Sequence, residues 1–276
     1  GTVIITPAGD YYLSGVNITD AENSASTLTF PTDQAVEYKL TLKNVDVAAS
    51  IVIDLKTKTT STITFKNAGV AVTEDPLTKD YNEQPFELSF EYYPDDIVTP
   101  EPIKYYPAAD SERQTPLDNA PVDAGSYVAV ATVKGSVTYK GTEKTLNLTI
   151  NKISAGTAAA PQISNITTNG FTYSTVNGQK YIVTENDTAP DATAEGWTLG
   201  NGDPVTLADK QPGKTYYVHT FLPGDKNHTD SDVVSRSATT AHTYAISVAP
   251  EGLNFFARVG SNNVVEGQKI TITNTG

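Results

Sequence analysis

The sequence predicts an all-β protein made of several modules in tandem. Three observations support this fold class. Apolar and polar residues alternate with period two in many short runs, and no run of ten or more residues follows the helical period of 3.6. Threonine, which suits half-exposed pleated surfaces, makes up about one residue in seven. The clearest alternating runs, each expected to form a strand, are 38–42, 50–55, 127–133 and 145–150.

Three stretches of small residues, Thr and Pro lack this alternation and indicate linkers. They lie at 73–80, 152–161 and 238–243. The predicted modules are therefore 1–73, 74–152, 153–240 and 241–276. The fourth module, 241–276, is too short for a core of its own and is expected to be the start of a further, truncated sandwich. Because the chain contains no Met and begins at Gly1, we expect it to be a piece of a longer protein.

The first module contains an internal repeat. Residues 40–45 (LTLKNV) recur as 63–68 (ITFKNA), an offset of 23 residues that is typical of one coil of a parallel β-solenoid. In a solenoid, Asn44 and Asn67 would stack at a corner, where Asn accepts positive φ. The alternative is a small sandwich with two similar antiparallel strands. The segment also resembles the coils of bacterial β-helix carbohydrate-binding domains.

The second module has motifs at both ends. Residues 79–85 (KDYNEQP), 122–131 (VDAGSYVAVA) and 144–152 (KTLNLTINK) resemble the immunoglobulin-like repeats of the MBG or YDG type found on bacterial surface proteins. The resemblance implies an immunoglobulin-like sandwich. Gly125 would serve the turn before a strand, and Tyr127 would enter the strand with its hydroxyl capping a nearby backbone group.

The third module resembles fibronectin type III-like modules. Residues 212–218 (PGKTYYV) are similar to the segment that leads into strand F, and 178–183 (GQKYIV) to a second strand of bacterial variants. The resemblance implies that Tyr216 is a corner tyrosine preceded by a turn at Gly213, and that Tyr181 is a core residue. The fourth stretch, 241–276, resembles the first strands of another immunoglobulin-like module.

Composition excludes several classes of function. The chain has no Cys, so disulfides, thiolate nucleophiles and Cys-ligated metals are excluded. With 19 basic and 32 acidic residues the net charge is −13, which argues against a nucleic-acid partner. No apolar run approaches the roughly 18 residues of a membrane span. We expect no cofactor.

Candidate catalytic and metal-binding residues are few. Asp95, Asp96 and Glu101 lie in one Pro-containing stretch, whereas glycosidase carboxylates must face each other across about 5–10 Å. A Ser–His–Asp triad lacks its usual G-x-S-x-G turn. We therefore expect no enzyme. A loop at 225–232 offers a weak calcium candidate, with a solvated loop as the alternative. Its possible ligands are Asp225, Asp230 and Asp232.

Aromatic residues suggest a carbohydrate-binding surface. Sugars pack their apolar faces on exposed rings, and Tyr doublets on strands should send one ring to each face. The candidate ligand-binding residues are Trp197, Tyr93 and Tyr106. The alternative is that these rings are ordinary strand residues.

Taken with the resemblances, these features predict a non-catalytic fragment of a secreted or surface-attached bacterial protein that acts as a spacer or adhesion scaffold. One alternative is a lectin-like protein that binds a polysaccharide or a host-cell glycan, through the first module or exposed aromatic rings. The other is a set of accessory modules of a polysaccharide-degrading enzyme. A monomer is expected.

Overall fold

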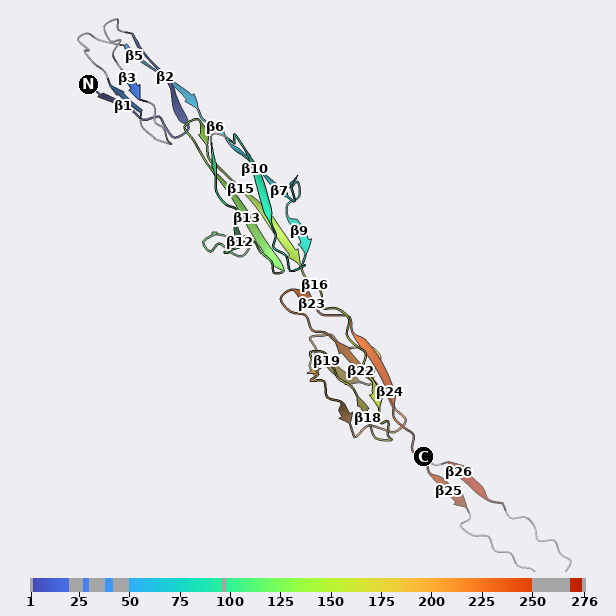
Figure 1. Ribbon diagram of the computed structural model, residues 1–276. Coiled ribbons are helices and arrows are strands. Elements are labelled where there is room, and N and C mark those ends of the chain that lie inside the picture. The colour runs from blue at the N-terminus through green and yellow to red at the C-terminus, as the bar shows by residue number, and fades with distance from the viewer. Residues whose placement is uncertain are drawn as a thin grey trace, which may run out of the picture. The chain divides into compact units, whose positions relative to one another are not determined.

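A computed structural model describes residues 2–19, 27–29, 38–41, 50–95, 98–249 and 269–274 (Figure 1). Within these ranges the chain forms strands and turns and no helix, so the predicted all-β class is confirmed. No helix in the described part is long and apolar enough to cross a membrane. The chain divides into two compact units, Gly1–Ile153 and Ser154–Gly276. Strand β16 (Ile153–Ser154) spans the division.

In the first module of unit 1, the pairs among strands β1 to β5 are all antiparallel. Its sheet has the order β1–β4–β3, and β2 pairs separately with β5. The strands are β1 (Thr2–Ile5), β2 (Tyr11–Thr19), β3 (Thr27–Thr29), β4 (Tyr38–Thr41) and β5 (Ser50–Thr57). Ile5 and Leu13 are the buried centre of a small core.

The solenoid expectation is wrong for the described strands. A solenoid needs parallel pairing between successive copies of a repeat, but the second copy lies in β7 (Thr62–Asn67), which pairs antiparallel with its neighbours. Asn67 ends β7, and the positive φ angles belong to Ala68 (48°) and Gly69 (83°). These two residues form the tight turn of a hairpin. Asn44 lies outside the described residues.

The second module of unit 1 is a sandwich of two sheets. One has the order β10–β7–β8, and the other has the order β11–β13–β15–β9 with β12 also on β13. Their bounds are β8 (Val70–Ala71), β9 (Leu77–Asp80), β10 (Leu88–Tyr93), β11 (Thr99–Pro100), β12 (Lys104–Pro107), β13 (Gly125–Lys134) and β15 (Thr142–Asn151). Strand β9 runs parallel to β15, and the other described pairs in the two sheets are antiparallel.

The core of this sandwich corrects the predicted boundary at residue 73. Ile63 and Phe65 of β7 are buried in the same cluster as Phe86, Leu148 and Ile150. Strand β7 therefore belongs to the second module, although the predicted boundary assigned it to the first. The composition of 73–80 predicted a linker, but strand β9 lies within this stretch and is half-buried at alternate positions.

Unit 2 holds a second sandwich with sheets of order β17–β18–β21 and β20–β19–β22–β24. Its strands are β17 (Ile163–Ser164), β18 (Phe171–Tyr173), β19 (Lys180–Thr184), β20 (Thr198–Leu199), β21 (Val205–Leu207), β22 (Thr215–Phe221) and β24 (Val234–Thr239). Aromatic residues fill its core, including Phe171, Tyr173 and Tyr216. Tyr181 is 1% exposed, as its assignment to the core predicted.

Two further pieces complete the described part of unit 2. A short strand, β23 (His228–Thr229), lies in the loop after β22. The stretch predicted to start a fourth module contains an antiparallel pair, β25 (Ile246–Ala249) and β26 (Thr271–Asn274). Every residue of β25 is exposed.

Candidate functional site

The three aromatic candidates lie in different environments. Tyr93 is 64% exposed at the end of β10. Tyr106 is only 7% exposed, so it cannot offer a ring to a ligand, and this assignment is wrong. Its neighbour Tyr105 is equally buried, which also contradicts the expectation that one ring of each doublet lies outside.

Trp197 is half-buried and held from two sides. Its ring meets that of Phe221 edge-on, with centroids 4.7 Å apart and planes at 88°. Its indole Nε1–H donates to the carbonyl of Asp191 at 2.9 Å. Together these contacts engage the ring and its polar end, so Trp197 braces the loop before β20 more than it offers a platform.

The calcium candidates do not come together as a metal site. Among the described residues no cluster of three acidic or His side chains could hold a metal. Asp225 Oδ1 accepts the N–H groups of Asn227 (2.7 Å) and His228 (2.8 Å), and Asp230 Oδ1 accepts that of Gly224 (2.6 Å). The bond from the Asn227 N–H first, and then those from the His228 ring and N–H, lower the pKa of the Asp225 carboxyl. The backbone carbonyl of Asp232 accepts the Ser231 hydroxyl. The loop is thus ordered by its own amides.

The two corner tyrosines occupy the places predicted for them. The Tyr127 hydroxyl donates to the carbonyl of Asp123 at 2.9 Å. Gly125 has φ +156°, and a Cβ there would approach the Tyr127 hydroxyl to 3.3 Å. Tyr216 is 4% exposed, and its hydroxyl oxygen accepts the N–H of Gln211 at 3.0 Å.

Gly213 serves the turn before Tyr216. Its φ of +67° lies in the left-handed region, and a Cβ would lie 2.6 Å from the ring of His242. The backbone therefore favours glycine here, and a larger residue would also have to displace the exposed ring of His242.

A buried histidine, His219, is held by polar neighbours in unit 2. Its Nδ1 lies 2.7 Å from the Ser235 hydroxyl, and its Nε2 lies 2.9 Å from the Thr184 hydroxyl and 3.1 Å from the Asn186 carbonyl. The ring stacks on Tyr217. These contacts satisfy both ring nitrogens, which is the arrangement of a structural histidine.

Sequence reasoning missed the junction between the two modules of unit 1. The loop 135–141 of the second module reaches the first, and β14 (Tyr139–Lys140) pairs with β6 (Thr59–Thr60). Val137 packs against the small core of Ile5 and Leu13. The only local signal is a pair of glycines, Gly135 and Gly141, whose backbones approach so closely that a Cβ on either would lie within 2.8 Å of the other's nitrogen.

Hydrogen bonds and an ion pair reinforce this junction. The Thr59 N–H donates to Thr138 O at 3.0 Å, and the buried Ser61 hydroxyl donates to Lys140 O at 2.7 Å. Lys140 Nζ lies 2.9 Å from Asp10 Oδ1. Because β5, β6 and β7 follow one another with one residue between successive strands, the chain passes through the junction almost fully extended.

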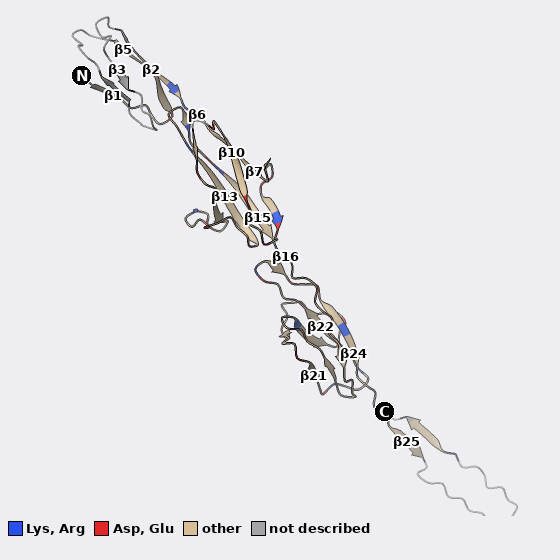
Figure 2. Cartoon of the chain, viewed as in Figure 1, with Lys and Arg blue, Asp and Glu red and all other residues tan. Residues whose placement is uncertain are grey.

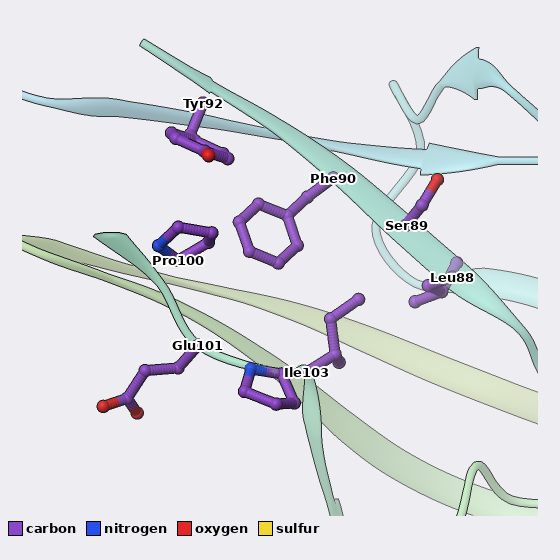
Figure 3. A pocket seen from close by; sticks show the side chains of 8 residues that line it. Leu88, Ser89, Phe90, Tyr92, Pro100, Glu101 and Ile103 are labelled. Atoms are coloured by element: carbon purple, nitrogen blue, oxygen red, sulfur yellow. The ribbon is translucent and has the colours of Figure 1, made fainter. Parts of the chain in front are cut away.

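Sequence reasoning also missed an apolar groove on the second module (Figure 3). Its volume is about 450 Å³. One wall is β10, through Leu88, Phe90 and Tyr92, and the other is formed by 100–103. The rings of Phe90 and Tyr92 are 6.0 Å apart, and Figure 3 shows Pro100 beside them.

Charged groups surround the groove in pairs. Glu101 Oε1 lies 2.9 Å from Lys134 Nζ, and Oε2 lies 3.8 Å from Lys104 Nζ. The bond from Lys134 and its charge lower the pKa of the Glu101 carboxyl. On the outer face of β10, Glu91 pairs with Lys66 of β7. In Figure 2 the charged residues of the described chain appear as short blue and red stretches on ribbons that are mostly tan.

Comparisons with known proteins add little. No family model matches the chain, and no curated protein matches it. Among solved structures, the crystal structure of domains A168-A170 from titin aligns with 87% of this chain and 89% of that one, at 12% identity and a TM-score of 0.25. A likeness at that score carries no conclusion about fold or function.

Proposed function

We propose that the chain is a non-catalytic spacer and adhesion scaffold from a secreted or surface-attached bacterial protein. The observation that carries this proposal is the junction of unit 1. There the second module places a strand, the half-buried Val137 and the Lys140 ammonium against the first. Such contacts hold the two modules at a set separation, which is what a spacer requires. The resemblance of 79–85 and 122–131 to surface repeats supports the same function and the extracellular location.

Because the chain has no Cys, cysteines can be introduced as labelling sites to test whether the junction holds the two modules at a fixed distance. Spin labels on the exposed positions Asn17→Cys and Thr64→Cys of the whole chain would report the distance between the two modules. We expect one narrow distance distribution. Val137→Asp should broaden it, because a carboxylate would be forced against an apolar core.

Val70→Asp is the matched control, since Val70 is 71% exposed on the same module and away from the junction. It should leave the distribution unchanged. A broad distance distribution in the labelled chain that Val137→Asp does not change would contradict the spacer proposal.

Carbohydrate binding is the second candidate, favoured by one observation. The Tyr93 ring is 64% exposed on β10, beside Pro94. The test is binding of the whole chain to a glycan array, which Tyr93→Ala should abolish. Tyr244→Ala, at a position 76% exposed, is the control that should leave binding intact.

A further inference from the structure

The apolar groove lies along an unpaired edge of a sheet. In the order β10–β7–β8, β10 has a strand on one side only. After β12 the described chain runs from Ala108 to Ala124 without forming another strand. The side of β10 that faces the groove is therefore open among the described residues.

The backbone of β10 shows which groups face that side. The Leu88 N–H donates to the hydroxyl of Tyr105 at 3.4 Å, so it points away from β7. Along an antiparallel strand alternate residues point their N–H and C=O groups the same way. Phe90 and Tyr92 therefore also direct their N–H and C=O groups toward the groove.

The pairing of β7 gives the same directions for the N–H and C=O groups of β10. Phe65 lies opposite Phe90, and its carbonyl accepts the Val72 N–H at 2.8 Å on the far side of β7. Phe65 and Phe90 thus form a pair that exchanges no hydrogen bonds. Ser89 and Glu91 make the bonds to β7, which leaves the groups of Phe90 and Tyr92 to the open edge.

Side chains beside this edge define what would fit. The inward side chains of Leu88, Phe90 and Tyr92 are only half-buried at the margin of the core. An added strand with apolar side chains at alternate positions would cover them. The outward side chains Glu87 and Glu91 are exposed.

Glu87 lies just before β10, and Glu91, which also pairs with Lys66 of β7, lies on its outward face. The whole stretch 74–152 has seven basic and fourteen acidic residues. Basic side chains at the outward positions of an added strand would lie beside Glu87 and Glu91, where opposite charges on neighbouring strands are favourable.

We propose that β10 is a docking edge for an extended peptide of a partner protein, with apolar side chains at alternate positions and basic side chains between them. The peptide would pair with the N–H and C=O groups of Phe90 and Tyr92 and place its apolar side chains in the groove. This is strand addition, in which main-chain bonds give affinity and alternate side chains give specificity. It is independent of the spacer proposal, because the junction lies elsewhere on the module.

The probe is a synthetic peptide of seven residues, Val-Lys-Val-Lys-Val-Lys-Val, added to the whole chain. Amide hydrogen exchange gives a pattern specific to strand addition. Without peptide, the Ser89 and Glu91 amides should exchange slowly and those of Phe90 and Tyr92 quickly. With peptide, exchange at Phe90 and Tyr92 should slow by about tenfold or more, as for amides that gain a lasting partner. A matched peptide with Glu in place of Lys should bind about tenfold more weakly, because two of its acidic side chains would lie beside Glu87 and Glu91.

Two variants of Phe90 distinguish the contribution of its main-chain N–H to peptide binding from that of its ring. Phe90→Pro removes one outward N–H while keeping the bonds to β7, a position where edge strands accept proline. Phe90→Ala removes the same ring but keeps the N–H. We expect the peptide to bind the alanine variant and not the proline variant. Equal binding to both would overturn the proposal. If the variants do not fold, the exchange pattern of the unmodified chain decides.

Three other outcomes would also overturn it. One is unchanged exchange at Phe90 and Tyr92 with peptide present. Another is protection of both amides in the chain alone at high concentration, which would assign the edge to a second copy. The third is a response of the groove to an oligosaccharide and none to the peptide.

Discussion

The Lys140 ammonium lies 2.9 Å from the Asp10 carboxylate, and the two residues belong to different modules of unit 1. Their side chains are 34% and 66% exposed, so solvent screens the pair. We expect a double-mutant cycle with Asp10→Asn and Lys140→Met to give a coupling energy of about 0.2–1 kcal/mol. Urea unfolding of the four proteins measures it. A coupling of several kcal/mol would mean that the ion pair, and not Val137 with the strand pairing, dominates the junction.

Removing the Tyr216 hydroxyl should lower the stability of the sandwich in unit 2. Tyr216→Phe leaves the Gln211 N–H without its acceptor, and we expect a loss of about 1 kcal/mol of unfolding free energy. Chemical denaturation measures the loss. Tyr217→Phe, at the neighbouring half-buried ring, is the control and should change stability by less than about 0.5 kcal/mol. Equal effects of the two variants would rule out a special role for the corner.

A methyl group at Gly170 should be poorly tolerated. A Cβ there would lie 2.0 Å from the carbonyl oxygen of Leu207, which is backbone and cannot swing aside. We expect Gly170→Ala to cost about 3 kcal/mol, the upper end of the range for overpacking. Gly9→Ala is the comparison, since a Cβ at Gly9 would meet nothing within 4 Å. Melting temperatures of the two variants test the contrast.

Acid should loosen the turn that follows β12. The Asp110 carboxylate accepts the Thr115 N–H and hydroxyl, each at 2.8 Å, and the Gln114 N–H at 3.2 Å. These bonds, that of the Thr115 N–H first, lower the pKa of Asp110 in the folded chain. The stabilisation is therefore present above the unfolded pKa of about 3.9 and is lost as pH falls through the lower folded value.

Carboxyl NMR shifts of Asp110 and amide exchange of Thr115 follow this transition. Asp110→Asn should remove the pH dependence at Thr115. An Asp110 that titrates at its ordinary pKa would show that the three bonds do not persist in solution.

Local sequence predicted those features whose contacts lie close along the chain. Alternation at 145–150 corresponds to β15, where Leu146, Leu148 and Ile150 are buried and the residues between them are less so. The corner tyrosines were predictable because Tyr127 and Tyr216 bond to backbone groups only four and five residues away.

Features that depend on distant partners could not be predicted in this way. The repeat at 63–68 says nothing about whether the neighbouring strand is parallel, and its partner β10 follows some twenty residues later. Likewise, Tyr105 and Tyr106 point to opposite faces of β12 and are both 7% exposed, which alternation cannot show. The groove exists because β10 has no second neighbour among the described strands, and sheet order is set by the whole module.

The parallel pairing of β9 with β15 has a mechanical consequence. Leu77 lies opposite Leu148, and Asp80 opposite Asn151. Tension that enters β9 from its N-terminal side and leaves β15 at its C-terminal side pulls the two strands in opposite directions along their length. The bonds between β9 and β15 are then loaded together in shear and do not break one by one. Because β7 enters the module before β9, this ladder carries the load only after β7 has separated from β10.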